Sequence, residues 1–365
     1  RRIRRAAAPL FPPGSAAMTD AGKRGASPTA LVVPAAKRAR GDASGRALVT
    51  ADGVPRTSSL DAPTMLLTGH AGEVFSCAFS PDGTVLASAG HDKQVLLWRA
   101  SGSCDNHAAI RGHKNAILRV AWAAGGDRVV TASADKTARA FDAATGAQVK
   151  RMADGGAIVN DVAATITGAP LILTGGDDGT PRVWDARVRR AVAALAGVRR
   201  PTLAVALAPG GDAAYAGGVD NVVRSWDLRK PGAPSLALRG HADTVTGLAV
   251  HPAATHLLSN AMDNTLREWD VRPFAPADRC ARVLVGGAHS FEKNLLRVAY
   301  SPDAARITAG SADRCVHVWS AKTGAPEYRL PGHDGSVNEV ALHPTEPVVA
   351  SASSDGTLYM GELAE

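Results

Sequence analysis

The feature of this sequence that most constrains its fold is a pattern repeated seven times between Thr64 and the C-terminus. Each copy has an Asp and, six residues later, a large apolar anchor that is usually Trp and usually followed by another Asp. The seven pairs are Asp92 with Trp98, Asp135 with Phe141, Asp178 with Trp184, Asp220 with Trp226, Asp263 with Trp269, Asp313 with Trp319, and Asp355 with Gly361. Successive anchors are 43, 43, 42, 43, 50 and 42 residues apart. In four copies a Gly-His pair precedes the anchor by 28 residues, with the histidines at His70, His113, His241 and His333. A period of about 40 to 45 residues with these ends is typical of one four-stranded blade of a β-propeller.

Seven blades of about 43 residues account for roughly 300 residues, so one closed ring is the economical division of a 365-residue chain. We therefore predict an all-β, seven-bladed propeller over residues 61–365, preceded by a tail over residues 1–60. The 37 Gly and 22 Pro suit turn-rich β architecture. Four isolated cysteines are typical of a reducing compartment. No stretch approaches the roughly 18 apolar residues of a membrane span, so we expect no membrane partner.

The net charge of +7 is concentrated at the N-terminus. Residues 1–56 hold eleven Lys and Arg against Asp20, Asp42 and Asp52, whereas residues 57–365 hold 30 basic and 31 acidic residues. A surface that binds nucleic acid without sequence preference needs excess positive charge. The charge distribution therefore disfavours direct, non-specific RNA binding by the blades.

Residues 1–60 are rich in Ala, Pro, Gly, Ser and Arg without apolar periodicity, so we expect them to be disordered. Lys37, Arg38 and Arg40 form a basic cluster that suits a nuclear import signal, and a solvated basic tail is the alternative interpretation. The Arg-rich opening superficially resembles an organelle transit peptide. The chain begins without Met, and Met18 is a more plausible start, so we interpret residues 1–17 as an upstream extension of the reading frame.

Each repeat predicts three inner strands separated by turns, in the first repeat over residues 74–79, 85–88 and 95–98. A fourth, outer strand precedes the next Gly-His pair, as at residues 236–238. Residues 65–67 form an outer strand with no repeat before it, and residues 358–363 end the last repeat without an outer strand after it. We expect these two segments to pair and close the ring, because closure removes two exposed sheet edges.

Two repeats carry a complete polar set of His, Ser, Asp and Trp. The sets are His70, Ser88, Asp92 and Trp98, and His241, Ser259, Asp263 and Trp269. Ser, His and Asp together suggest a hydrolase, but the set recurs at the repeat period and no GxSxG elbow is present. We predict instead that the Asp fixes the histidine tautomer and that the Trp Nε1–H pairs with the buried hydroxyl. The sets are thus predicted to be structural.

The remaining repeats lack one or more members of the set. Phe141 replaces Trp in the second repeat, and Gly155 stands where the third would place His. The fourth has no Gly-His pair and Ala216 in the Ser/Thr position, the sixth has Ala309 there, and the seventh ends in Gly361. We expect less rigid blades at these repeats rather than missing ones.

The 50-residue step between Trp269 and Trp319 is the one irregularity in the period. About five extra residues fall within 272–279 and two more within 291–296. Loops presented by a rigid scaffold often carry function, so Phe274 and, on the opposite face, Phe291, Glu292 and Lys293 are candidate partner contacts. Ordinary loop variation, with each Phe packed against its own blade, is the alternative.

The repeats resemble those of WD40-repeat propellers over about residues 63–365. A narrower resemblance lies in words outside the repeat signature: MLLTGHAGEV (65–74), CDNHAAIRGH (104–113), LLSNAMDNTLREWDVRPFAPADRC (257–280), FEKNLLRVAYSPD (291–303), LPGHDGSVNEVALHP (330–344) and SASSDGTLYMGEL (351–363). Together with VVPAAKRAR (32–40), these words resemble the WD40 subunit family of the U5 small nuclear ribonucleoprotein. Three residues depart from the family pattern and put local blade stability in doubt. They are Gly155, Phe141 and Glu268, the last at a position where an apolar strand residue is usual.

The resemblance implies a nuclear, non-catalytic scaffold that supports spliceosome assembly and pre-mRNA splicing. It also implies partners: the largest U5 core protein, with the helicase and GTPase subunits nearby, and U5 RNA indirectly through the particle. No contact residue follows from it, and it implies no cofactor.

A competing interpretation is a substrate receptor of a cullin-RING ubiquitin ligase. Arg187, Arg229 and Arg272 each follow a Trp-Asp pair by two residues, in WDxR boxes that resemble the motif by which such receptors dock on the ligase adaptor. Solvation of the strand end is the structural alternative for these arginines. A reader of histones or other peptides would need an acidic or aromatic-lined face. An enzyme in the central channel is disfavoured, because the sequence contains no nucleotide loop, metal cluster or catalytic dyad.

Overall fold

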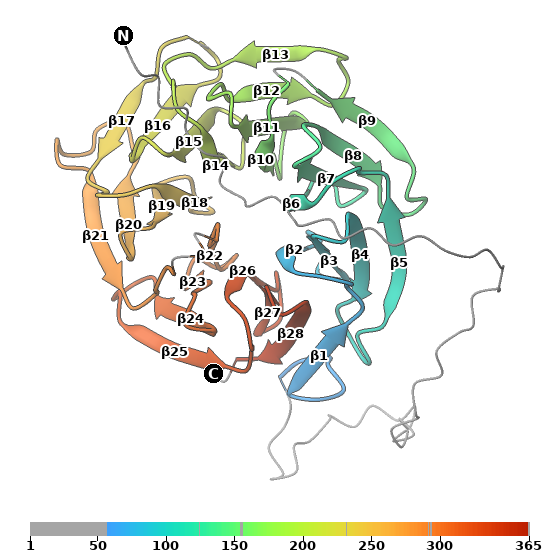
Figure 1. Cartoon of the computed structure of the whole chain (residues 1–365). Coiled ribbons are helices and arrows are strands. Elements are labelled where there is room, and N and C mark those ends of the chain that lie inside the picture. Colours follow the sequence, from blue (N-terminus) through green and yellow to red (C-terminus); the bar gives the residue numbers. More distant parts are fainter. Residues whose placement is uncertain are drawn as a thin grey trace, which may run out of the picture. The chain divides into compact units, whose positions relative to one another are not determined.

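The computed structural model describes residues 57–363, apart from 124, 154, 155, 231, 291 and 293. These residues form 28 strands in seven four-stranded antiparallel sheets that follow one another around a ring (Figure 1). The predicted all-β, seven-bladed propeller is therefore confirmed. In the described part, no helix is long and apolar enough to cross a membrane. Residues 1–56 of the predicted tail, with Lys37, Arg38 and Arg40 and the extension over 1–17, lie outside the described residues.

The blades are numbered here in chain order, and each runs from its innermost to its outermost strand. Blade 1 contains β2 (Val74–Phe79), β3 (Val85–Gly90), β4 (Gln94–Arg99) and β5 (Asn106–Arg111). Blade 2 contains β6 (Ile117–Trp122), β7 (Arg128–Ser133), β8 (Ala138–Asp142) and β9 (Gln148–Met152). Blade 3 contains β10 (Val159–Ala164), β11 (Leu171–Gly176), β12 (Arg182–Asp185) and β13 (Ala191–Ala194). Blade 4 contains β14 (Thr202–Leu207), β15 (Ala213–Gly218), β16 (Val222–Asp227) and β17 (Leu236–Arg239).

The last three blades complete the ring. Blade 5 contains β18 (Val245–Val250), β19 (His256–Ala261), β20 (Thr265–Asp270) and β21 (Cys280–Val285). Blade 6 contains β22 (Val298–Tyr300), β23 (Arg306–Ala309), β24 (Cys315–Ser320) and β25 (Pro326–Pro331). Blade 7 contains β26 (Val337–Leu342), β27 (Val348–Ser353), β28 (Thr357–Glu362) and, as its outermost strand, β1 (Thr64–Thr68).

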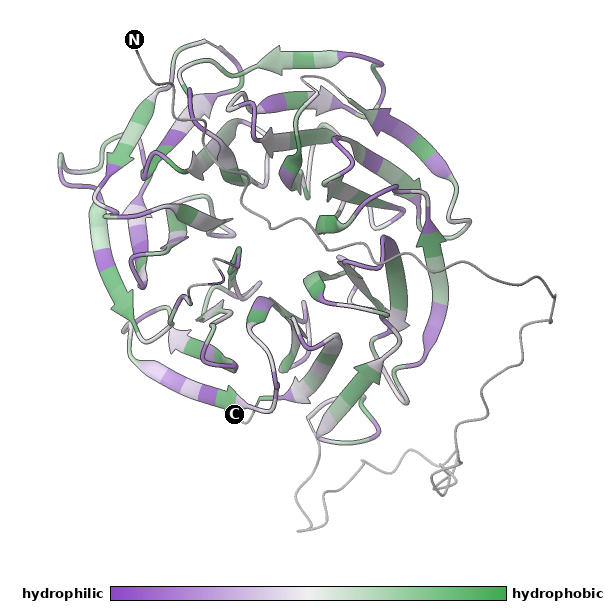
Figure 2. Ribbon diagram, viewed as in Figure 1, coloured by the Kyte–Doolittle hydropathy of each residue, from purple (hydrophilic) through white to green (hydrophobic). Residues whose placement is uncertain are grey.

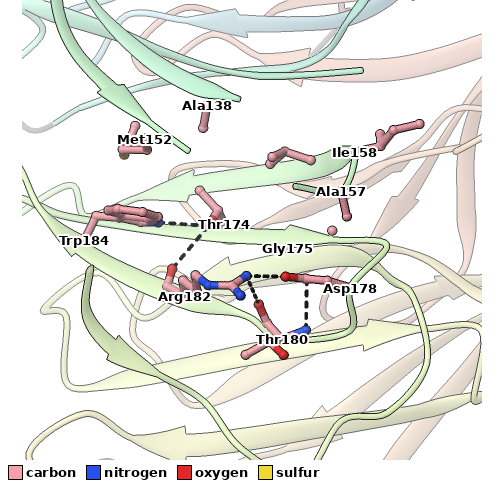
Figure 3. Close-up of a pocket in the computed structure, with 12 residues that line it drawn as sticks. Ala138, Met152, Ala157, Ile158, Thr174, Gly175, Asp178, Thr180, Arg182 and Trp184 are labelled. Carbon is pink, nitrogen blue, oxygen red and sulfur yellow. Dashed lines mark hydrogen bonds and ion pairs between the residues drawn. The ribbon is translucent and has the colours of Figure 1, made fainter. Parts of the chain in front are cut away.

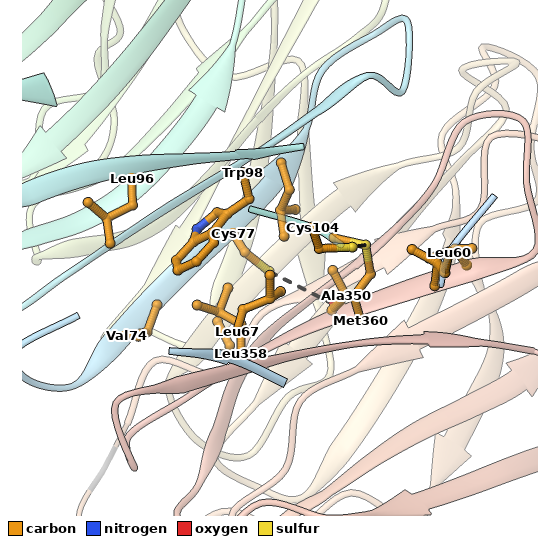
Figure 4. Close-up of a cluster of buried hydrophobic side chains, with 13 residues drawn as sticks. Leu60, Leu67, Val74, Cys77, Leu96, Trp98, Cys104, Ala350, Leu358 and Met360 are labelled. Carbon is orange, nitrogen blue, oxygen red and sulfur yellow. Dashed lines mark hydrogen bonds between the residues drawn. The ribbon is translucent and has the colours of Figure 1, made fainter. Parts of the chain in front are cut away.

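The ring closes where the sequence predicts. Strand β1 pairs antiparallel with β28, and Met65 lies opposite Met360. The seam between blades 7 and 1 is filled by a buried cluster that includes Leu67, Trp98 and Met360 (Figure 4). Closure thus joins residues from the two ends of the propeller in one core and supplies the fourth, outermost strand of the last blade.

The segment just before β1 also belongs to this seam. Leu60 is fully buried in the same cluster and forms a parallel bridge with Gly102. The Ser59 backbone N–H donates to the Glu346 carboxylate at 2.9 Å. The predicted boundary between tail and propeller, at residue 60, falls inside this docked segment.

The core lies between neighbouring sheets. The five anchor tryptophans and Phe141 are each at most 4% exposed, and seven clusters of buried apolar residues fill the spaces around the ring. Outer strands such as β9 and β25 mix hydrophilic and hydrophobic residues (Figure 2), because one face of each is solvated. All four cysteines are free.

Candidate functional site

The polar set of blade 1 forms a continuous hydrogen-bonded chain. His70 Nδ1 lies 2.8 Å from an Asp92 carboxylate oxygen, and His70 Nε2 lies 2.7 Å from Ser88 Oγ. Because a carboxylate can only accept, Nδ1 carries the proton and Nε2 accepts from the serine hydroxyl. Trp98 Nε1–H then donates to Ser88 Oγ at 2.8 Å. The chain ties the turn before β2 to the strands β3 and β4.

Blade 5 repeats this geometry with His241, Ser259, Asp263 and Trp269. The corresponding distances are 3.0 Å, 2.6 Å and 2.8 Å. Ser88 and Ser259 are both fully buried, so a substrate carbonyl cannot reach either hydroxyl. These sets can hold a blade together, and they cannot perform nucleophilic attack.

Protonation states in the blade 5 set follow from burial and hydrogen bonding. Burial lowers the pKa of His241, although the bond to Asp263 opposes the shift. Burial alone would raise the pKa of Asp263, but hydrogen bonds from the Thr265 hydroxyl, the Ala242 N–H and His241 outweigh it and lower the pKa. At neutral pH a neutral imidazole therefore faces an ionised carboxylate.

Two further blades keep the His, hydroxyl and Asp but change the aromatic group. In blade 2, His113 bonds Asp135 and Thr131, and the Phe141 ring packs edge-on at 5.9 Å from the His113 ring. In blade 7, His333 bonds Asp355 at 3.0 Å and Ser351 at 2.8 Å. Tyr359 lies edge-on to that histidine at 4.7 Å, two residues before Gly361. Sequence reasoning missed Tyr359, although an aromatic four residues after the repeat Asp is a visible signal.

Blades 3, 4 and 6 use a different partner for the repeat Asp. A cationic or imidazole side chain four residues further on, in the third strand of the blade, binds the carboxylate. The pairs are Arg182 with Asp178 at 2.5 Å, Arg224 with Asp220 at 2.5 Å, and His317 with Asp313 at 3.0 Å. This substitution explains how the repeat Asp is satisfied where no Gly-His histidine reaches it. The fixed spacing of four residues is a sequence signal that the repeat analysis overlooked.

The third blade shows the result in detail (Figure 3). Trp184 Nε1–H donates to Thr174 Oγ1 at 2.9 Å, while Arg182 reaches Asp178. Beside them is a cavity of about 20 Å³ that Ala138 and Met152 also line, with room for about one water molecule. Gly155, assigned to the histidine position from the sequence, lies outside the described residues, but the residue 28 positions before Trp184 is Gly156, which has a positive φ of 65°.

His289 precedes the blade 6 insertion and does not join a polar set. Both of its ring nitrogens are buried without a hydrogen-bond partner among the described residues. Burial lowers the pKa of this histidine to about 4. The ring is therefore neutral at physiological pH.

Glu268 is buried but well partnered. The Tyr300 hydroxyl donates to its carboxylate at 3.0 Å, and Arg282 Nε lies 3.5 Å away. Tyr300 comes from β22, so the contact joins blades 5 and 6. A polar residue at this normally apolar position is thus satisfied across the seam.

A ring of seven equivalent positions, four of them charged, lies at the centre of the propeller, and sequence reasoning missed it. In six blades the innermost strand has a register shift, and the residue after it is Ser76, Arg119, Asp161, Ala204, Gly247 or Glu339. Arg297, just before β22, holds the corresponding place in blade 6. Each of these residues precedes its anchor by 22 or 23 positions, a signal that the repeat period would have shown.

The side chains of this central ring bind one another. Arg119 pairs with Glu339 and, at 3.4 Å, with Asp161. Arg297 Nη1 bonds Asp161 Oδ2, the Leu203 carbonyl and the Thr246 carbonyl, each at 3.0 Å. Ala204 and Gly247 are small, and a Cβ on Gly247 would lie 2.9 Å from the Leu296 carbonyl. Gly247 therefore allows the backbone that carries Arg297 to approach β18 closely, and the Arg297 side chain links blade 6 to blades 3, 4 and 5.

The loops that break the period lie at opposite ends of blade 5. Phe274, between β20 and β21, is fully exposed, so it does not pack against its own blade. Phe291 and Lys293, between β21 and β22, lie outside the described residues. Glu292 is exposed and accepts hydrogen bonds from Asn294 at 3.3 Å and Ser336 at 3.4 Å.

The three WDxR arginines adopt one geometry at the end of the third strand in blades 3, 4 and 5. Each guanidinium donates through Nε and Nη2 to the Asp two residues earlier: Arg187 to Asp185, Arg229 to Asp227 and Arg272 to Asp270. The arginine side chains remain 69%, 74% and 58% exposed, respectively. The bidentate pair lowers the pKa of Asp185 and of Asp270 to about 2. The arrangement caps the strand end and still presents three cationic groups.

Comparison with known proteins gives two results. The family model "WD domain, G-beta repeat" matches residues 62–99, 104–142, 152–185, 232–270, 279–320 and 324–360. The unmatched stretch between 185 and 232 contains the three inner strands of blade 4, β14 to β16, where both the Gly-His pair and the Ser/Thr position are changed.

Several relatives match over nearly the whole propeller. The U5 small nuclear ribonucleoprotein 40 kDa protein of Bos taurus is 49% identical over 311 residues, which is 85% of this chain and 86% of the relative. The protein of the same name in Homo sapiens is 48% identical, covering 85% of this chain and 87% of its own length. Pre-mRNA-splicing factor cwf17 of Schizosaccharomyces pombe is 41% identical over 84% of this chain and 90% of the relative.

Proposed function

This chain belongs to the WD40-repeat family, within the group of U5 small nuclear ribonucleoprotein 40 kDa proteins, and from that premise we propose that it acts as a non-catalytic scaffold of that particle. In this role it supports spliceosome assembly and pre-mRNA splicing in the nucleus. The observation that carries the proposal is identity of 48–49% over 85% of the chain to proteins of that name. A second relative named as a splicing factor supports the same process.

The geometry favours a scaffold over an enzyme. The Ser, His and Asp sets are buried and bonded internally, and the charged residues at the propeller centre pair with one another. Partner binding is therefore assigned to the outer surfaces and loops. The proposed partners are the largest U5 core protein and the neighbouring helicase and GTPase subunits, with U5 RNA held indirectly through them.

Affinity purification of the tagged full chain from nuclear extract tests this role. We expect U5 RNA and the largest core protein in the eluate at a stoichiometry close to that of the tagged chain. Recovery of the chain without U5 RNA or any core splicing protein would overturn the proposal.

A second candidate role is docking on a ubiquitin-ligase adaptor. It is favoured by the shared geometry of Arg187, Arg229 and Arg272, which stay exposed at the same end of three consecutive blades. The test is pull-down by a purified adaptor of wild-type chain and of the triple Arg→Ala variant. Loss of capture only in the triple variant would support this role, and equal recovery of both would reject it.

We also propose that residues 1–56 direct nuclear import through Lys37, Arg38 and Arg40. A fluorescent reporter fused to residues 1–56 should accumulate in the nucleus. The matched variant with these three residues changed to Ala should spread through the cell. Equal distributions would contradict the import role.

A further inference from the structure

The seam between blades 2 and 3 is underfilled because of two alanines in β8. Ala138 and Ala140 lie three residues and one residue before the anchor Phe141. The same two positions in the other repeats hold larger side chains. They are Val95 and Leu97, Pro181 and Val183, Val223 and Ser225, Leu266 and Glu268, Val316 and Val318, and Leu358 and Met360. In a close-packed interior, truncation at such positions leaves space that neighbours fill only in part.

Each alanine lines a cavity at its own end of the seam. Ala138 lines the cavity of about 20 Å³ beside Trp184. Ala140 lines a larger cavity of about 250 Å³ at the end where β8 and β12 finish. Its walls are mainly apolar, from Val130, Leu171 and Ile172, and Arg128 and Arg187 also line it. An apolar cavity of about 150 Å³ already accepts benzene, so the larger one has room for a single apolar side chain.

Exposed apolar residues adjoin the lining of this larger cavity. Ile166 follows the lining residue Thr165 and is 61% exposed, and Val188 follows the lining residue Arg187 and is 50% exposed. The Val188 carbonyl accepts a hydrogen bond from Lys150 Nζ at 2.6 Å, which ties its loop to blade 2. Apolar surface beside an apolar cavity is suited to a peptide that inserts one side chain and rests its backbone on the rim.

The charge around the larger cavity is predominantly positive. Its lining and the loop after β12 contain Arg128, Arg187, Arg189 and Arg190. The acidic residues facing them are Asp127, 3.4 Å from Arg128, Asp142, opposite Arg128 in the β7–β8 ladder, and Asp185, which pairs with Arg187. Lys150 adds a fifth positive charge, because its Nζ donates to the Asp185 and Val188 carbonyls. Five cationic side chains against three aspartates favour an acidic partner, since complementary charge speeds encounter and selects the partner.

We propose that the 250 Å³ cavity between blades 2 and 3 is a docking pocket for one leucine-sized side chain of an acidic peptide segment in a protein partner. The pocket would give the proposed scaffold a specific way to bind a partner. That this partner is a protein rests on the proposed scaffold role. Ala140 provides the depth, and the arginines beside it select acidic flanking residues.

The test uses purified full-length chain and fluorescein-labelled twelve-residue peptides in an anisotropy assay. One peptide alternates Glu and Gly around a central Leu, the second has Ala at the centre, and the third has Lys in place of Glu. We expect the Leu peptide to bind at least about tenfold more tightly than the Ala peptide, because burying a leucine side chain is worth that factor. The Lys peptide should bind more weakly still. Equal binding of the Leu and Ala peptides would overturn the proposal.

Two pairs of variants locate the binding. Ala140→Leu restores the bulk found at Leu97 and should reduce binding of the Leu peptide about tenfold. Ala138→Val, which restores the bulk of Val95 at the other end of the same strand, should leave binding unchanged. Arg187→Ala should weaken binding severalfold, whereas Arg229→Ala, which removes the same ion pair from blade 4, should not. If Ala140→Leu and Ala138→Val behave alike, the pocket is not the site.

A photo-reactive leucine at the centre of the same peptide gives an independent readout that needs no variant. Cross-links should map to residues 123–130, 165–172 or 186–190, and cross-links elsewhere would overturn the proposal. A labelled oligouridine of equal length tests the alternative ligand. The alternative outcome is that the oligouridine binds and the Leu peptide does not. If Arg187→Ala then weakens RNA binding and Ala140→Leu does not, the arginines bind RNA and the peptide proposal is excluded.

Failure of the pocket and failure of the scaffold role can be told apart. The peptide assay uses the isolated chain, whereas membership of the U5 particle is read by co-purification of U5 RNA. If the chain binds the peptide but does not co-purify with U5 RNA, the pocket proposal stands and the proposed membership of the U5 particle is rejected. If the chain co-purifies with U5 RNA but does not bind the peptide, membership of the particle stands and the pocket proposal is rejected.

Discussion

Arg297 and Asp161 lie 136 residues apart in the sequence and form a 3.0 Å ion pair between Nη1 and Oδ2, both side chains being 3% exposed. The pair joins blade 6 to blade 3 through the centre of the propeller. Burial disfavours the charged form of the guanidinium and lowers the pKa of Arg297. The ion pair and the carbonyl bonds to Leu203 and Thr246 offset that cost, so the pair depends on all of these blades being in place.

Removal of one partner from this ion pair should strongly destabilise the folded protein. We expect Arg297→Met to lower the free energy of unfolding by about 3–5 kcal/mol, because it leaves the buried Asp161 carboxylate with only the longer 3.4 Å contact to Arg119. Urea denaturation followed by tryptophan fluorescence measures the change. The double variant with Asp161→Leu should recover part of the loss, since no unpaired charge remains. A single variant as stable as wild type would show that the central pair contributes nothing.

The polar set of blade 5 should also contribute to stability. Asp263→Ala removes the acceptor for His241, the Ala242 N–H and Thr265, and should cost about 1–3 kcal/mol through loss of charged hydrogen bonds. Thermal melting measures it. The matched control is Asp243→Ala, an exposed residue two positions after His241, which should change stability by less than about 0.5 kcal/mol. Equal melting curves for both variants would reject the structural role of Asp263.

Blade 2 offers a stabilising substitution. In blade 1 the Trp98 indole donates to the Ser88 hydroxyl. Phe141→Trp would place an indole at the same position in blade 2, where it can donate to the Thr131 hydroxyl that already bonds His113. One added buried hydrogen bond should stabilise the chain by about 0.5–1.5 kcal/mol. The reference is Trp98→Phe in blade 1, which should destabilise by a similar amount. If Phe141→Trp lowers the melting temperature, the space around Gly112, whose Cβ would lie 3.2 Å from the Phe141 ring, is too small for the larger side chain.

Stability should fall in mild acid. Burial lowers the pKa of His289 to about 4 and lowers the pKa of His113, His241 and His333, whereas histidine in the unfolded chain titrates near 6.5. Between these values the unfolded state binds more protons, so the free energy of unfolding decreases as pH falls below about 6.5. His289 alone should account for about 1 kcal/mol at pH 5.5.

Melting curves between pH 7.5 and 5.5 measure this dependence. His289→Leu cannot be protonated and should show a smaller drop than wild type. His91→Leu, in the turn between β3 and β4, serves as the matched histidine-to-leucine control. A wild-type melting temperature that stays constant over this range would contradict the prediction.

Phe274 should matter for partner binding and not for folding. Because its side chain is fully exposed, Phe274→Ser should leave the melting temperature within about 1 °C of wild type while reducing recovery of core splicing proteins. Val149→Ser, on the solvent side of β9 and 50% exposed, is the matched apolar control. Unchanged recovery with Phe274→Ser would remove this loop from the binding surface.

Several structural features could be predicted from the repeat alone. The period located the blades, the unpaired segments at 65–67 and 358–363 predicted closure, and the spacing of His70, Ser88, Asp92 and Trp98 matched the hydrogen-bonded chain in the structure. These features depend on contacts between residues at fixed offsets within one sheet. Periodicity reports such offsets directly.

Other features needed the tertiary structure. Sequence reasoning missed Tyr359, the pairs such as Arg182 with Asp178, and the central ring with Arg297 and Asp161. Their positions recur in the repeat, but the residue type changes from blade to blade, so a search for the repeated letter overlooks them.

The sequence by itself determined the number of blades, the way the ring closes and the family to which the chain belongs, because these follow from a repeated local pattern and from whole-chain similarity. Only the tertiary structure decided that Phe274 is exposed, that Glu268 is paired across a seam, and that Ala140 opens a cavity between blades 2 and 3. Each of these depends on what a neighbouring blade places opposite the residue. That pairing is set by the closed ring and by no single repeat.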